Sequence, residues 1–220
     1  MTTTLRAPDP HARSPRPRPV VLLDGTGALL NPLAELLSRS GHEVRAGAAE
    51  LVAADHALRD GAHGAPRLVI VVAARALSPT RASAWRGLVA HLPVVYDERT
   101  VMIGPVVAAG PPCLHCLDLH RHDHDPSWPA RRGGLLAAGG DPAPDAALAT
   151  VATGLAALLA RNVLEQRRHL HGVSLELDAS SPFIRPRRWA PHPLCVCSGA
   201  QGTMQAWPAG RDRGRGTRRR

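Results

Sequence analysis

Residues 20–37 have the sequence VVLLDGTGALLNPLAELL, in which an apolar run, a glycine turn and an amphipathic segment follow one another directly. The apolar residues from 19 to 25 predict a buried strand that ends in the glycine turn. A helix is expected next, over 31–45, with Asn31 as its N-cap, Pro32 in its first turn and Gly41 as its stop signal. This succession predicts a strand–turn–helix unit, the first building block of an α/β sheet.

The rest of the chain extends this pattern. Further strands are expected at 42–47, 66–74 and 92–99, and a capped amphipathic helix at 78–91. The order predicts a doubly wound sheet with right-handed crossovers. The later elements are expected as follows: a short strand in 100–112 broken at Gly-Pro, a flexible crossover loop at 129–143, a long alanine helix over 144–169 starting near Asp145, and a closing hairpin at 172–178 and 183–189.

The net charge of +9 is concentrated at the ends of the chain. Residues 210–220 carry +5 and residues 6–19 carry +3, which leaves +1 for the body. All of the cations are arginines, a bias typical of GC-rich coding sequence. The segments 1–19 and 200–220 are therefore expected to be disordered tails that flank a folded domain at 20–199. No basic surface studded with aromatic residues is visible, which argues against nucleic-acid binding.

Nothing at the N-terminus has the apolar core of a secretory signal. The uncharged, alanine-rich run at 146–160 is expected to be too short and too rich in alanine for a membrane span, which needs about 20 apolar residues. A cytoplasmic protein is expected, and in that compartment cysteines are more often ligands than disulfides.

The turn at Gly25 and Gly27 lies where a dinucleotide or ATP fingerprint would sit. The third position of the fingerprint is Leu30, Pro32 removes an amide, and Glu50 is the nearest acidic candidate for the ribose. No arginine lies beside the turn, and the chain contains no lysine to neutralise phosphate. The sequence indicates a degenerate nucleotide turn, and ATP is not an expected cofactor.

All four cysteines fall in two tight pairs, at 113–116 and 195–197. Such pairs in a cytoplasmic chain predict a tetrahedral thiolate zinc site with Cys113, Cys116, Cys195 and Cys197 as ligands. A closed site of four cysteines is structural and would tie the C-terminal hairpin to the middle of the chain. The alternative is a redox CxxC, which would leave the second pair without a role.

Polar residues follow the first cysteine pair in the segment LDLHRHDHDPSWP. His120, Asp123 and His124 have helical spacing and could form a second, open metal site for hydrolysis. The alternative is a polar helix or loop after the knuckle, because the prolines at 126 and 129 break a helix at once. The latter is preferred, and no catalytic residue is assigned.

Three segments carry a family resemblance: IGPVVAAGPPCLHCLDLHRHDHDPSWP, GVSLELD and RRWAPHPLCVC. From about residue 20 to 197 the chain resembles the ThiF-like partner proteins of thiazole/oxazole-modified peptide pathways. The resemblance implies an α/β fold of the ubiquitin-activating type, a four-cysteine zinc site and a nucleotide turn that is often degenerate. It also implies a non-catalytic partner that presents a precursor peptide to a YcaO-type cyclodehydratase and activates it.

One feature departs from that family. Its members usually carry an N-terminal winged-helix domain that recognises the peptide, whereas a Pro/Arg segment precedes Val20 here. A separate polypeptide that supplies the domain, a reduced partner subunit and a truncated gene are all consistent with this departure. The alternative function is an active adenylyltransferase that charges a peptide or carrier C-terminus. Homodimers are possible, but no interface can be read from the sequence.

Overall fold

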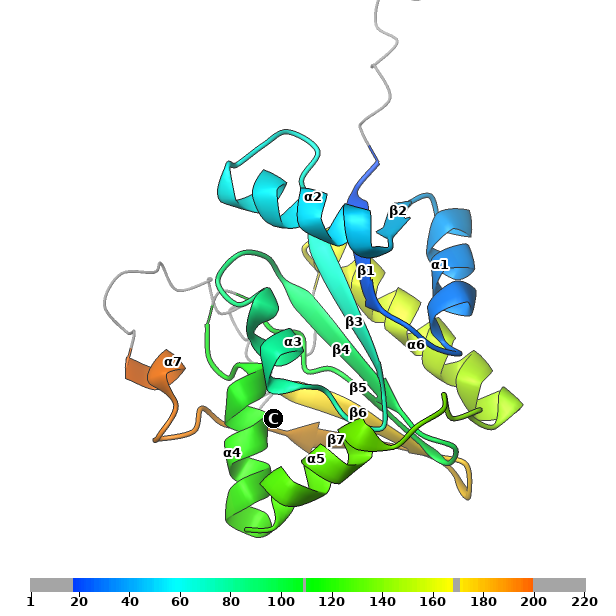
Figure 1. Ribbon diagram of the computed structural model, residues 1–220. Coiled ribbons are helices and arrows are strands. Elements are labelled where there is room, and N and C mark those ends of the chain that lie inside the picture. Colours follow the sequence, from blue (N-terminus) through cyan, green and yellow to red (C-terminus); the bar gives the residue numbers. More distant parts are fainter. Residues whose placement is uncertain (1–17, 109, 168–170, 200–220) are drawn as a thin grey trace, which may run out of the picture.

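The computed structural model describes residues 18–108, 110–167 and 171–199. The predicted tails, apart from residues 18 and 19, lie outside the described residues. The described chain forms a seven-stranded sheet in the order β2-β1-β3-β4-β5-β6-β7 with helices against both faces (Figure 1). The strands are β1 (Val20–Gly25), β2 (Glu43–Ala46), β3 (Leu68–Ala74), β4 (His91–Tyr96), β5 (Thr100–Ile103), β6 (Val173–Asp178) and β7 (Ser181–Arg188). The helices are α1 (Leu30–Arg39), α2 (Ala48–Arg59), α3 (Pro79–Ala84), α4 (Leu114–His124), α5 (Trp128–Ala137), α6 (Ala146–Leu164) and α7 (Val196–Gly199).

The sheet has a parallel half and an antiparallel half. Strands β1 to β4 are mutually parallel, whereas β5, β6 and β7 pair antiparallel in succession. The strand order reverses at β1, whose neighbours are β2 and β3. This switch point lies where a doubly wound sheet usually binds its ligand, next to the carboxyl ends of the strands. The predicted α/β architecture is confirmed in this mixed form.

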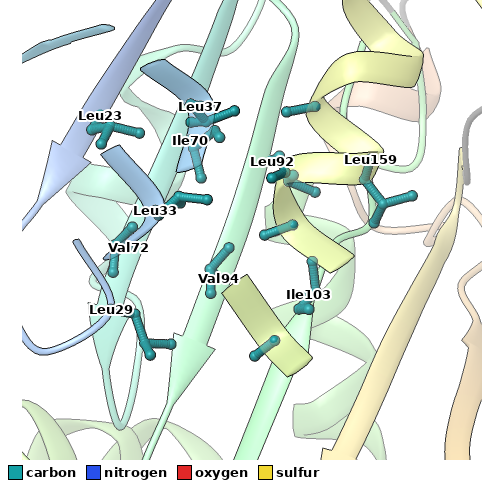
Figure 2. Packing of buried hydrophobic residues seen from close by; sticks show 14 of the residues in the cluster. Leu23, Leu29, Leu33, Leu37, Ile70, Val72, Leu92, Val94, Ile103 and Leu159 are labelled. Carbon is teal, nitrogen blue, oxygen red and sulfur yellow. The ribbon is translucent and has the colours of Figure 1, made fainter. Parts of the chain in front are cut away.

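The main core lies between the sheet and the α1/α6 layer. Figure 2 shows leucine side chains of α1 packing on Ile70 and Val72 of β3, with Leu92 and Ile103 beneath α6. Alanines of α6 such as Ala152 and Ala160 are fully buried, so this helix lies close against the strands. A smaller cluster on the opposite face joins β1 and β3 to α2 and to Trp85.

Helix α6 was correctly predicted at its start and differs at its end. The Asp145 carboxylate accepts hydrogen bonds from the amides of Ala147 and Leu148, both at 3.0 Å, which is an N-cap. The helix ends at Leu164, and the predicted end at 169 lies outside the described residues. By length and composition alone it could cross a membrane, contrary to the expectation from the sequence. Its packing against the sheet accounts for its apolar character.

Three helices were missed, one of them the single turn α7 in the segment of the second cysteine pair. Segment 48–59, to which no element was assigned, forms α2, and the predicted loop at 129–143 contains α5. Two helices also have different bounds. Helix α1 begins one residue before Asn31, because the turn after Gly27 is already wound and Leu29 occupies the cap position without a side-chain bond. Helix α3 ends at Ala84, well short of the predicted end at 91. The next residue, Trp85, turns inward, and its indole donates to the Asp24 carboxylate at 2.8 Å.

Candidate functional site

The four cysteines meet at one point, although the two pairs are far apart in sequence. The Sγ atoms of Cys113 and Cys195 are 3.6 Å apart, those of Cys116 and Cys197 are 3.2 Å apart, and Cys113 and Cys116 are separated by 4.0 Å. None of the four forms a disulfide. A zinc ion with Zn–S bonds of about 2.3 Å holds its sulfurs about 3.8 Å apart, so the spacing fits a tetrahedral ion. The predicted ligands are therefore brought together in a cluster that could hold a metal ion.

The local fold explains this convergence. Cys113 is the N-cap of α4, and Cys116 lies in the first turn of the same helix. The second pair follows Trp189, which is buried and donates from its indole to Ser174 of β6 at 2.9 Å. The end of the hairpin is thus fixed to the sheet immediately before the segment that carries Cys195.

The thiols have uneven proton affinities. Burial raises the pKa of Cys195 and of Cys197. For Cys113, burial acts in the same direction, but backbone amide hydrogen bonds from Cys116 and His115, together with the neighbouring thiols, bring its pKa below the usual value. Four thiolates held this closely need a cation to offset their repulsion, and a bound metal would supply it while releasing protons. The residues therefore fit a closed structural ion that leaves no coordination position for a substrate.

A histidine clamp holds the second cysteine segment against α4. We give this name to His120, Asp123, His192 and the carbonyl of Ala190. His192 is buried and its Nε2 donates to the Asp123 carboxylate at 2.8 Å, while its Nδ1 accepts from the amide of Leu194 at 3.1 Å. His120 lies 3.0 Å from the Ala190 carbonyl oxygen. The pair of contacts ties α4, which carries one cysteine pair, to the segment that carries the other.

The clamp differs from the predicted second metal site. The third member of the group is His192, contributed by a distant segment, and not His124. Because the Leu194 amide donates to Nδ1, the proton of the neutral ring sits on Nε2, which is the nitrogen that faces Asp123. A metal there would have to displace this proton and the hydrogen bond. The geometry favours a brace, and the motif WAPHPLC was the signal that could have identified His192.

The glycine turn lies at the switch point, as its position in the first strand–helix unit predicted. A Cβ on Gly25 would lie 2.0 Å from the Val72 carbonyl oxygen, so this residue allows β1 and β3 to approach. A Cβ on Gly27 would lie 1.9 Å from the hydroxyl of Tyr96. Gly27 has a φ of +109°, which also favours glycine.

The space beside the turn is filled by the protein itself. Tyr96 at the end of β4 is 1% exposed; its hydroxyl accepts from the Ala28 amide at 2.8 Å and donates to the Asp141 carboxylate at 2.6 Å. We call Tyr96 and Asp141 the tyrosine plug. Asp141 belongs to the segment between α5 and α6, which runs past the lower ends of the strands (Figure 1). Arg75, which follows β3, donates to the carbonyl of Gly140 at 2.9 Å and holds the same segment.

The tyrosine plug pairs with the Ala28 amide, one of the backbone amides near the start of α1 that could otherwise bind a phosphate. In a nucleotide site the amides at the start of the helix point at phosphate oxygens. Here the Ala28 amide is already paired with Tyr96, and burial raises the pKa of Tyr96 to about 12, helped by its hydrogen bond to Asp141. Glu50, the candidate ribose partner, lies in the first turn of α2. Sequence reasoning missed the plug because Tyr96 and Asp141 are far apart in the chain and form no local motif.

No protein-family model and no curated protein matches this chain. Among solved structures, it is similar to a heterocyclase in complex with substrate and cofactor, with 17% identity over 82% of this chain and a TM-score of 0.60. It is also similar to the E. coli microcin synthetase McbBCD complex, with 15% identity over 86% of this chain, 72% of that chain and a TM-score of 0.55. E. coli MccB with ATP has 15% identity over 81% of this chain, 66% of that chain and a TM-score of 0.52.

These likenesses establish a shared fold. The chain spans only 25% of the heterocyclase chain, so most of that protein has no counterpart here. The sheet, the glycine turn and the cysteine cluster therefore occur in a chain whose fold is shared by parts of heterocyclases and microcin synthetases.

Proposed function

We propose that this chain is a non-catalytic, ThiF-like scaffold subunit that activates a YcaO-type cyclodehydratase in the synthesis of azoline rings on a ribosomal peptide. The tyrosine plug is the observation that carries the proposal. It lies beside Gly27, in the turn where a phosphate-binding fingerprint would sit, and it pairs the Ala28 amide internally, which supports the proposal. A subunit with this plug would rely on its partner for ATP chemistry. The fold likeness to a heterocyclase and to a synthetase complex supports the same class of pathway.

The cysteine cluster has a structural role in this proposal. We assign it a zinc ion bound by Cys113, Cys116, Cys195 and Cys197. The ion would hold the hairpin of β6 and β7 against α4, so that the surface offered to a partner is rigid. The chain would act in the cytoplasm with a precursor peptide that it binds directly or through a separate recognition domain.

The alternative is an active adenylyltransferase, and the fold likeness to MccB with ATP is the observation that favours it. Calorimetric titration of the full chain with ATP and magnesium, followed by a pyrophosphate-release assay with candidate peptides, separates the two functions. The scaffold predicts no saturable binding and no release. Tight ATP binding with turnover would establish the adenylyltransferase and refute the scaffold.

Reconstitution tests activation directly. A YcaO-type cyclodehydratase from the same genome and its precursor peptide would be assayed with and without this chain, with azoline formation followed by the loss of water from the peptide mass. The scaffold predicts a large rate increase that also occurs with the Y96F variant, because the plug contributes nothing to catalysis. No increase with the natural chain would contradict the proposal.

A further inference from the structure

A pocket lies beyond the glycine turn, on the antiparallel half of the sheet. Its volume is about 320 Å³. A row of residues paired across the strands lines one side of it: Val95 of β4, Met102 of β5, Glu176 of β6 and Arg185 of β7. Arg121 of α4 and Trp128 at the start of α5 line it from the helical side. None of the cysteine ligands lines this pocket.

Arg121 is a largely buried cation that forms no ion pair with a carboxylate in the part of the chain that the structure describes. Its guanidinium lies 5.0 Å from the ring centre of Trp128 and 5.7 Å from that of Trp189. The only hydrogen-bond acceptor it contacts within the described chain is the sulfur of Met102, at 3.1 Å. A thioether is a weak acceptor, whereas a guanidinium has five N–H donors. Burial lowers the pKa of Arg121, which measures the cost of holding this charge away from water.

The nearby carboxylates are engaged elsewhere. Asp118, one turn earlier on α4, accepts from Arg132 at 2.6 Å and from the Trp128 indole at 3.2 Å. In the pocket, Asp97 accepts from the amide and hydroxyl of Thr100. Asp178 accepts from Ser180 in the hairpin turn.

Glu176 and Arg185 complete the charge pattern of the pocket. Glu176 is paired with Arg187 at 3.6 Å. Arg185 forms no ion pair or hydrogen bond within the described residues and lines the open side next to Phe183. Among the described residues, the pocket therefore presents two guanidinium groups that form no ion pair with a carboxylate, beside an exposed aromatic ring.

We propose that this pocket binds a carboxylate of a peptide, presented as an acidic side chain or as a free C-terminus. A planar guanidinium stacked on an indole is suited to bidentate binding of a carboxylate. The volume is near the lower limit of ligand pockets, so it suits a carboxylate with a short length of chain. Phe183, with 75% of its surface exposed at the rim, offers an apolar contact for the flanking residues. The binding is independent of whether the chain activates a cyclodehydratase.

The test uses the full chain labelled with ¹⁵N in its arginines, and the R121Q variant assigns the Arg121 Nε resonance. The probes are N-acetyl-Ala-Glu-Ala-amide, its glutamine counterpart, N-acetyl-Ala-Ala-Ala with a free carboxyl end, and glutarate. A carboxylate peptide is expected to shift the Arg121 resonance saturably, with a Kd of about 1 mM. The glutamine peptide is expected to bind about tenfold more weakly, because it lacks the charge-assisted bond.

The two carboxylate peptides distinguish the source of the group, since the tighter one identifies either the side chain or the terminus. A glutamine peptide that binds as tightly as both carboxylate peptides, or no saturable shift by either carboxylate peptide, would overturn the proposal. If glutarate binds as tightly as the peptides, the pocket does not require a peptide, and that part of the proposal would be refuted.

Three further variants test carboxylate binding without changing Arg121, in case R121Q folds poorly. R185Q removes the exposed guanidinium at the rim and is expected to weaken binding several-fold, whereas E176Q removes a competing carboxylate and is expected to strengthen it. R39Q, on the exposed end of α1, is the matched control for loss of one positive charge and is expected to bind as the natural chain does. R185Q and R39Q with equal affinities would exclude a role for the pocket.

Discussion

Tyr96 is the only tyrosine in the chain, so its ionisation can be followed directly. Burial and the hydrogen bond to Asp141 raise its pKa from 10.0 to about 12. The fold therefore favours the neutral hydroxyl over the phenolate. A raised pKa contributes stability that is complete below pH 10, the unfolded value, and that is lost as the pH rises toward 12. At 1.36 kcal/mol for each pKa unit, this contribution is about 3 kcal/mol.

The assay is a spectrophotometric titration of tyrosinate absorbance, paired with urea unfolding at several alkaline pH values. We expect a titration midpoint near 12 in the folded chain and near 10 in urea. The Y96F variant should lose about 1–2 kcal/mol at neutral pH, because the Ala28 amide and the Asp141 carboxylate lose their partner. Its stability should then fall less steeply than that of the natural chain above pH 10, so the two unfolding free energies should converge and then cross as the pH approaches 12.

The D141N variant is the matched control, because it keeps an acceptor for the hydroxyl and removes the negative charge. Its midpoint should lie between those of the folded and unfolded natural chain. A folded chain that titrates near 10, or a Y96F variant with an unchanged alkaline loss of stability, would refute the plug.

The remaining predictions concern the metal cluster, the clamp and the long helix. Elemental analysis is expected to find one zinc in the natural chain and none in the C116S variant, which should also unfold at a lower temperature; stoichiometric zinc in C116S would exclude Cys116 as a ligand. The D123A variant should weaken zinc binding about tenfold in a chelator competition, the scale found for residues that orient metal ligands; an unchanged affinity would show that the clamp is not needed to position the cysteines. The D145A variant should lose about 1 kcal/mol of unfolding free energy with the N-cap of α6, and an unchanged urea midpoint would contradict that role.

The elements predicted correctly are those whose signal is local. The apolar runs at β1 and β3 and the cap at Asp145 depend on neighbouring residues only. Helix α2 was missed because it buries one residue, Ala54, and so has almost no apolar stripe. Helix α5 contains two adjacent glycines and buries none of its residues, a composition that favours a loop. In both helices the small number of buried residues leaves little periodicity for sequence reasoning to detect.

The features of the candidate site also fall into those that the local sequence predicts and those that it does not. The convergence of the cysteines was predictable, because two tight pairs have few other uses in a reduced chain. The tyrosine plug and the histidine clamp could not be predicted from the sequence, since each joins a strand or helix to a residue from a distant segment. Tyr96 and Asp141 carry no motif, and their contact depends on the path of the segment between α5 and α6.

The outer strands limit how the sheet itself can take part in an assembly. Strand β2 spans only four residues, and β7 at the other edge carries Pro182 and Pro186. Proline has no amide to donate, and a short strand offers few pairing groups, so neither edge is a good template for an added strand. A protein that binds this chain would therefore have to contact side chains on the faces and loops and not extend the described sheet. That arrangement disfavours edge-to-edge growth into fibres.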